Sequence, residues 1–78
     1  MEELYKIIRE VLNIENSVQI NNEHGPGDLP GWDSLGHVNL MNTIESKYNI
    51  SIDMDDMIQI ESISDIIGIL KRNNVIEN

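Results

Sequence analysis

A chain of 78 residues with a formal net charge of −9 and no cysteine has room for one small domain with a single apolar core. Enzymes with their own substrate cleft are usually larger, and without cysteine there are no disulfides and no thiolate metal sites. The negative charge disfavours nucleic acid and anionic membranes as partners, because both attract Lys and Arg. We therefore expect one domain over residues 1–78 that binds, carries or regulates.

The sequence indicates no targeting or membrane segment. Met1-Glu2-Glu3 lacks the basic start and apolar run of a secretion signal. No apolar stretch approaches the roughly 20 residues that span a bilayer. We expect a cytoplasmic protein, monomeric and without a membrane span.

The first predicted element is an amphipathic helix over residues 2–14. Its apolar residues recur at the spacing of one helical face, with charged and polar residues opposite. Residues 15–33 then break this pattern with Asn, Gly and Pro, which favour turns. A loop this long is unusual in a compact domain unless it has a function or is disordered. The apolar positions of the helix are Leu4, Ile7, Ile8, Val11 and Leu12.

A second helix is predicted over residues 34–48, with Asp33 as its N-cap. Four of its residues fall in one narrow sector of a helical wheel, and we expect this sector to face the core. Leu35 projects almost opposite to the sector, and Val38 lies near its edge. The residues of the core sector are Leu40, Met41, Ile44 and Tyr48.

A short third helix is expected over residues 54–58, and a fourth follows Ser62 and ends before Asn73-Asn74. Ser62 is its predicted N-cap, and Asp65 three residues later makes a variant of the capping box. Together these elements predict an all-α four-helix bundle, with three long helices, one short third helix and a long loop between the first two. The expected buried stripe of the fourth helix is Ile63, Ile66, Ile67 and Leu70.

The most informative feature is the run Gly31-Trp32-Asp33-Ser34-Leu35, where the loop meets the second helix. In the first turn of a helix, unpaired N–H groups and the helix dipole favour a phosphate near Ser34. An apolar Leu35 that faces away from the core is costly for an isolated protein but useful for docking on a partner. These residues predict an exposed hydroxyl that can carry a phosphodiester beside an apolar contact.

Asp33-Ser34-Leu35 at the start of the second helix resembles the attachment motif of acyl carrier proteins and peptidyl carrier proteins. The resemblance extends over nearly the whole chain, including its length, helix order, acidity and short third helix. It implies that 4′-phosphopantetheine from coenzyme A is attached to Ser34, and that the thiol of this arm holds acyl or aminoacyl groups as thioesters. The carrier itself would not be an enzyme, because partner enzymes supply the catalytic groups.

The same resemblance implies partners and further site residues. The partners would be a phosphopantetheinyl transferase, an enzyme that loads the acyl or aminoacyl group, and a downstream transferase or synthase. Asp33 would cap the helix and assist the modifying enzyme. The expected docking contacts are Leu35, Val38, Asn39 and Glu45. If the bundle shelters its cargo, as family members do with short or medium acyl chains, the expected lining is His37, Met41, Ile44, Met54, Met57 and Ile58.

The outer face of the second helix departs from the pattern of fatty-acid carriers, in which this helix is strongly acidic and is recognised by basic partner surfaces. Here Glu45 is the main acid. The run Ser34-Leu35-Gly36-His37 is more similar to carriers of specialised pathways, such as polyketide, peptide or cell-surface modification routes. We therefore expect a specialised pathway, with housekeeping fatty-acid synthesis as the alternative.

Other interpretations of these residues lead to other functions. Ser34 could serve only as a first-turn residue of a small helical adaptor that never carries the arm. A hydrolase nucleophile elbow would need an α/β sheet, which this chain is too short to build. We interpret His37 as a half-buried residue that bonds to the loop rather than as a base. The acids Asp53, Asp55 and Asp56 do not match a calcium-binding loop, so no metal site is predicted.

Overall fold

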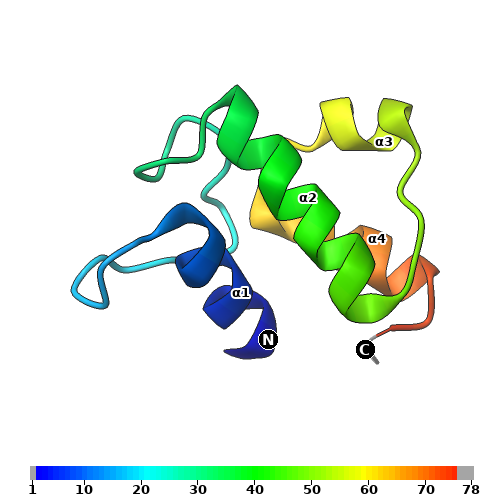
Figure 1. Ribbon diagram of the computed structural model, residues 1–78, viewed down its shortest axis with the longest axis horizontal. Helices are drawn as coiled ribbons and strands as arrows, with labels where there is room; N and C mark the ends of the chain where they lie inside the picture. Colours follow the sequence, from blue (N-terminus) through cyan, green and yellow to red (C-terminus); the bar gives the residue numbers. More distant parts are fainter. Residues whose placement is uncertain (1, 76–78) are drawn as a thin grey trace.

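Four helices joined by one long loop and two shorter segments form the part of the chain that the structure describes, residues 2–75 of this computed structural model (Figure 1). No strand occurs within these residues, and the predicted all-α bundle with one short helix is confirmed. None of the helices in this range is long and apolar enough to cross a bilayer. The helices are α1 (Glu2–Leu12), α2 (Ser34–Tyr48), α3 (Met54–Gln59) and α4 (Ile63–Arg72).

An asparagine in the left-handed conformation follows each of the three long helices. Asn13, Asn49 and Asn74 have φ of 57°, 55° and 59°, a region that Asn tolerates better than most residues. After each Asn, the next residue donates its N–H to the carbonyl oxygen five positions back, at 2.9–3.0 Å. These bonds satisfy carbonyl groups that a helix end leaves unpaired. The prediction that the first helix reaches residue 14 was therefore two residues too long.

The core is built mainly by α1, α2 and α4, with α2 crossing the middle of Figure 1. The predicted inward sector of α2 is largely confirmed, since Leu40, Met41 and Ile44 are fully buried and Tyr48 is half-buried. In α4, Ile69 is buried where Ile67 was expected, and Ile67 is only partly buried. The other buried apolar residues are Leu4, Ile7, Ile8, Leu12, Ile14, Leu29, Trp32, Ile52, Ile60, Ile63, Ile66 and Leu70.

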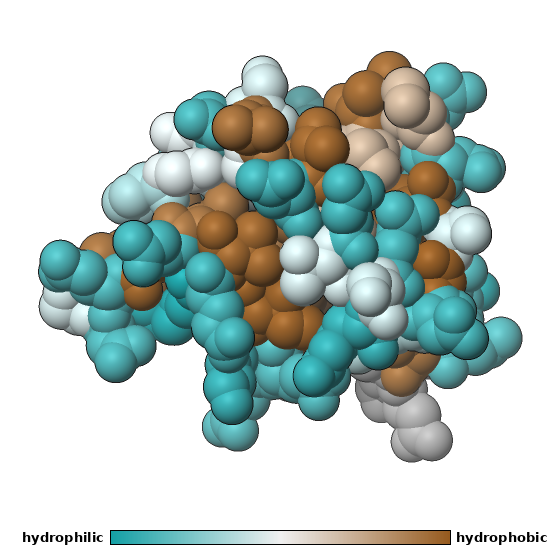
Figure 2. All heavy atoms as spheres, in the orientation of Figure 1, coloured by the Kyte–Doolittle hydropathy of each residue, from teal (hydrophilic) through white to brown (hydrophobic). Residues whose placement is uncertain are grey.

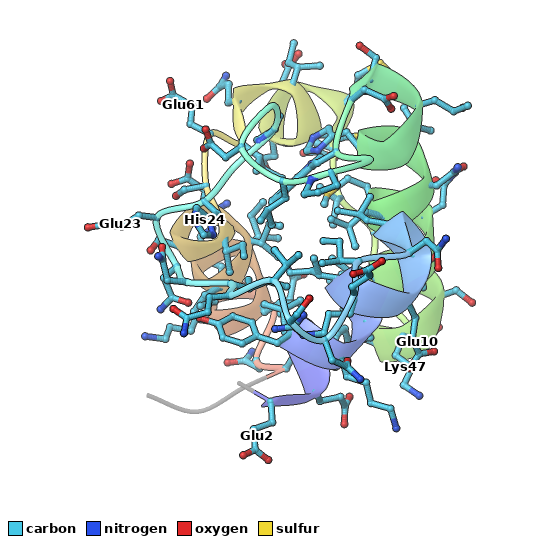
Figure 3. The ribbon with its side chains drawn as sticks, turned by 90° about the vertical axis from the view of Figure 1, so that its left-hand side faces the viewer. Glu2, Glu10, Glu23, His24, Lys47 and Glu61 are labelled. Atoms are coloured by element: carbon cyan, nitrogen blue, oxygen red, sulfur yellow. The ribbon has the colours of Figure 1, made fainter. Side chains whose placement is uncertain are left out.

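The long loop between α1 and α2 is tied to the start of α4. Carbonyl oxygens of His24 and Asn22 accept hydrogen bonds from the backbone N–H groups of Ile63 and Ser64, at 2.8 and 3.0 Å. Figure 3 shows Glu23 and His24 beside α4. The loop thus supplies acceptors for N–H groups that a helix start leaves unpaired.

The N-terminal cap of α4 differs from the predicted capping box. Ser62 occupies the N-cap position, but its side chain makes no capping hydrogen bond. Asp65 Oδ2 instead accepts from the backbone N–H of Glu61, at 2.8 Å. Neither bond of the predicted capping box is therefore formed, because the Asp65 carboxylate accepts from Glu61 rather than from Ser62 and the loop carbonyls satisfy Ile63 and Ser64 instead.

Candidate functional site

Ser34 is the first residue of α2 and is exposed to solvent. Asp33 has the extended backbone of an N-cap, and its Oδ1 accepts from the backbone N–H of Gly36 at 2.8 Å. The first helical bond runs from the His37 N–H to the Asp33 carbonyl oxygen, also at 2.8 Å. The N–H groups of Ser34 and Leu35 lie in the first turn, where a helix offers no internal acceptor. This arrangement suits an anionic group on the Ser34 oxygen.

Two glycines allow the loop to lie directly against the first turn of α2. A Cβ added to Gly36 would lie 2.0 Å from the carbonyl oxygen of Gly31. Gly31 has a φ of 79°, and a Cβ there would lie 2.8 Å from the carbonyl oxygen of Leu12, at the end of α1. Only hydrogen atoms in place of Cβ permit these approaches. The end of α1, the loop and the start of α2 are thus held in close backbone contact beneath Ser34.

Trp32 anchors the same stretch of loop from the inside. Its side chain is only 1% exposed, and its backbone bonds to Leu29 and Gly27 at 3.1 and 2.8 Å. The residue two positions before Ser34 is therefore fixed in the core. Ser34 therefore lies at the edge of a well-anchored segment rather than on a free loop.

His37, one turn after Ser34, links three parts of the fold. It is half-buried, and its Nδ1 lies 2.9 Å from Trp32 Nε1 in the loop. Its Nε2 lies 2.9 Å from the carbonyl oxygen of Met57 in α3. The sequence indicated a bond to the loop, whereas the bond to α3 gave no sequence signal. The indole ring of Trp32 and the imidazole ring of His37 also stack, with their centroids 6.1 Å apart.

Large apolar side chains are exposed on both sides of His37. Leu35 and Val38 of α2 are 71% and 45% exposed, and Met54 and Ile58 of α3 are 72% and 71% exposed. We call these four residues the apolar surface. Figure 2 shows apolar side chains gathered over the first part of α2 and over α3. The outward position predicted for Leu35 is therefore what the structure shows.

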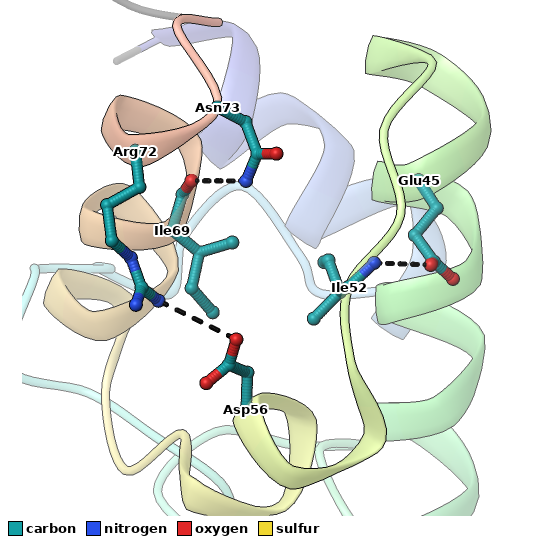
Figure 4. A network of polar contacts seen from close by, with 6 residues as sticks. All are labelled: Glu45, Ile52, Asp56, Ile69, Arg72 and Asn73. Atoms are coloured by element: carbon teal, nitrogen blue, oxygen red, sulfur yellow. Dashed lines mark hydrogen bonds and ion pairs between the residues drawn. The ribbon is translucent and has the colours of Figure 1, made fainter.

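The predicted docking contacts on α2 differ in their surroundings. Asn39 is exposed beside Val38. Glu45 is half-buried, and its Oε2 accepts from the backbone N–H of Ile52 at 2.7 Å (Figure 4). Glu45 lies eleven positions after Ser34, which is about 16 Å along a helix. Glu45 thus has a structural bond of its own, away from Ser34.

The six residues expected to line an acyl pocket differ widely in their exposure to solvent. Met41 and Ile44 are fully buried, His37 and Met57 are half-buried, and Met54 and Ile58 face solvent. Two surface grooves, between α3 and α4 and between α1 and α2, are lined by other residues. Access of cargo to Met41 and Ile44 would therefore require the core to open.

Charged groups do not form a metal site in the part of the chain described. Within residues 2–75, no group of three or more His, Asp or Glu is placed to hold a metal ion. Asp56 of α3 and Arg72 of α4 form an ion pair at 3.9 Å with both side chains exposed (Figure 4). An exposed pair of this kind contributes little to stability.

Comparison with known protein families gives one finding. A family model described as "phosphopantetheine attachment site" matches residues 2–70. No curated protein and no solved structure matched the chain. Proteins of this family bear 4′-phosphopantetheine as a covalent prosthetic group and act as carriers rather than as catalysts. Because the match spans most of the chain, from α1 into α4, this protein belongs to the phosphopantetheine attachment site family.

Proposed function

We propose that this protein holds acyl or aminoacyl groups as thioesters on a 4′-phosphopantetheine arm attached to Ser34. The observation that carries the proposal is the exposed Ser34 at the first position of α2, next to a Leu35 that is 71% exposed. A modifying enzyme needs free access to the hydroxyl and a surface to hold while it acts. Both lie within two adjacent residues.

In the attachment step, Ser34 Oγ forms a bond to the phosphorus that bears the pantetheine of coenzyme A. The pyrophosphate bond breaks, adenosine 3′,5′-bisphosphate leaves, and the hydroxyl proton passes to a base of the transferase. The first-turn N–H groups and the dipole of α2 favour the negative charge on the new phosphodiester. When attached, the arm supplies a thiol on a flexible tether, which raises the effective concentration of the cargo at each partner enzyme.

Partner enzymes are proposed to dock beside Ser34, on Leu35, Val38 and Asn39, with Glu45 as a more distant contact. The first three are exposed and lie in the first two turns of α2. Asp33 contributes by holding the first turn through its bond to Gly36. The partners are a phosphopantetheinyl transferase, a loading enzyme and a downstream transferase or synthase.

A specialised biosynthetic pathway is proposed in preference to housekeeping fatty-acid synthesis. Apart from the capping Asp33, the exposed side chains in the first two turns of α2 are apolar or neutral, and the main acid of α2 bonds the Ile52 backbone. Docking through apolar contacts should depend weakly on salt concentration, whereas docking of an acidic helix on a basic patch should weaken steeply as the salt concentration rises. The kcat/KM of the loading enzyme, measured over a range of salt concentrations, distinguishes the specialised pathway from fatty-acid synthesis. A steep decrease with salt would favour the fatty-acid alternative.

The attachment itself is tested by incubating the protein with coenzyme A and a phosphopantetheinyl transferase of broad specificity and then measuring the intact mass. We expect the mass to increase by one phosphopantetheine. Ser34→Ala should abolish the increase. Ser64→Ala is the matched control, because Ser64 is also exposed in the first turn of a helix. An unmodified parent protein, or a Ser34→Ala variant that is still modified, would refute the proposal.

A non-modified adaptor is the second candidate, because the apolar surface is present without any arm. It predicts that Ser34→Ala leaves function intact, whereas Leu35→Asp abolishes partner binding. The carrier proposal predicts that either change abolishes function.

A further inference from the structure

The helix α3 has few means of holding its position. It is six residues long, has no fully buried side chain, and its N-cap residue Asp53 makes no side-chain capping bond. Met57 is half-buried against the core, and the exposed ion pair of Asp56 with Arg72 adds little. The buried Ile52 and Ile60 fix the chain on either side of it. The bond from His37 to the Met57 carbonyl is therefore a large part of what sets the position of α3.

The hydrogen-bond partners of His37 determine where its proton lies. The indole Nε1–H of Trp32 can only donate, so His37 Nδ1 must accept and carries no proton. In the neutral ring the proton then lies on Nε2, which donates to the carbonyl oxygen of Met57. The chain of bonds from the loop through α2 to α3 is thus consistent with only one tautomer. We call Trp32, His37 and Met57 the clasp.

We propose that His37 is a positioning residue that fastens α3 to α2 and so places Met54 and Ile58 in one surface with Leu35 and Val38. The occupant of this surface during modification is the phosphopantetheinyl transferase, docked through apolar contacts, since the surface is apolar and adjoins Ser34. That part of the inference rests on the proposed function. The clasp is a property of the protein before any modification.

Two substitutions at the same position test the clasp. His37→Gln retains an acceptor for Trp32 and a donor for Met57, whereas His37→Leu fills similar space and removes both. In His37→Leu, amide hydrogen exchange in residues 54–59 should accelerate by about two- to tenfold per lost hydrogen bond. Exchange in α1 should change little. The KM of the transferase should increase with kcat nearly unchanged, and His37→Gln should restore both values towards those of the parent protein.

A spectroscopic measurement on the parent protein keeps the test decisive if His37→Leu fails to fold. The 15N NMR signals of His37 should show a protonated Nε2 and an unprotonated Nδ1. For the exchange measurement, His24→Gln is the control, because His24 Nδ1 accepts from the Asn21 N–H within the loop and has no bond to α3. Exchange in residues 54–59 should be the same in this variant as in the parent. The opposite tautomer at His37, or exchange in α3 that is equal in His37→Leu and the parent, would overturn the clasp. If Ser34 is not modified but α3 still responds, the clasp stands and the carrier function fails.

Discussion

Replacement of Gly36 by Ala should destabilise the protein, although Ala is the better helix former. In an ordinary helix interior this change stabilises by about 1 kcal/mol. At Gly36, however, the added Cβ would lie 2.0 Å from the Gly31 carbonyl oxygen and 3.1 Å from Leu12 Cδ2. The Leu12 side chain can adjust, but the Gly31 oxygen belongs to the backbone. The loop and the first turn of α2 must therefore separate by about 1 Å to reach the 3.0 Å limit of real contacts.

The size of the effect follows from two opposing contributions. Overpacking of a well-packed site costs about 1–3 kcal/mol, and a clash with backbone lies at the upper end of that range. The gain in helix propensity offsets about 1 kcal/mol of it, which leaves a net decrease of about 2 kcal/mol in the free energy of unfolding. In a domain of this size, that decrease lowers Tm by about 8–16 °C.

Urea unfolding followed by the fluorescence of the buried Trp32 measures this difference. Gly68→Ala is the matched control, because Gly68 lies inside α4 and a Cβ there would meet nothing within 4 Å. That variant should gain about 1 kcal/mol from helix propensity alone. If Gly36→Ala were as stable as the parent, the loop would not lie against α2 as described, and the account of how Ser34 is held would be wrong.

Three further outcomes are expected. The pKa of Tyr48 is raised from 10.0 to about 12. Burial is the largest cause, and a hydrogen bond to Glu3 and the negative charge of Glu3 add to it. The resulting stabilisation is fully present below pH 10 and is lost as the pH rises to about 12. The absorbance of tyrosinate should report the ionisation of Tyr48, and Glu3→Gln should lower the pH at the midpoint of that titration. Ile44→Ala should cost about 2–5 kcal/mol in urea unfolding, because Ile44 is fully buried, and a smaller loss would mean that the core collapses around the site. Glu45→Ala should cost about 1–3 kcal/mol by removing a charged acceptor from the Ile52 N–H, and an unchanged free energy of unfolding would show that this bond contributes nothing.

Local signals in the sequence were sufficient to predict α2. The carboxylate of Asp33 marked its start, and the spacing of Leu40, Met41 and Ile44 gave its inward side, so the expected range of residues 34–48 agrees with the structure. The end of α1 was less certain for a physical reason. Ile14 continues the apolar pattern and is buried, but the left-handed Asn13 has already ended the helix. Periodicity reports burial, and burial does not require helical backbone.

Contacts between distant segments could not be predicted in the same way. The carbonyl oxygens that satisfy the start of α4 come from His24 and Asn22, about 40 residues earlier in the chain. The nearby Ser62 and Asp65 gave a local pattern for capping this helix, and neither of its two bonds is formed. The sequence near a helix start can suggest a local cap, but only the folded arrangement determines which acceptors its N–H groups find.

The orientation of α3 illustrates the same limit and bears directly on function. Six residues are too few to show a clear apolar stripe, and Met54 and Ile58 were expected in the lining of an acyl pocket. Both face solvent, where exposed apolar groups are unfavourable for an isolated protein. The segment before Ser34 is anchored by the buried Trp32, whereas α3 depends on the bond between His37 and Met57. The proposed carrier thus combines a firmly held attachment serine with a short helix that exposes Met54 and Ile58 and that a docking enzyme or a cargo could displace by breaking few contacts.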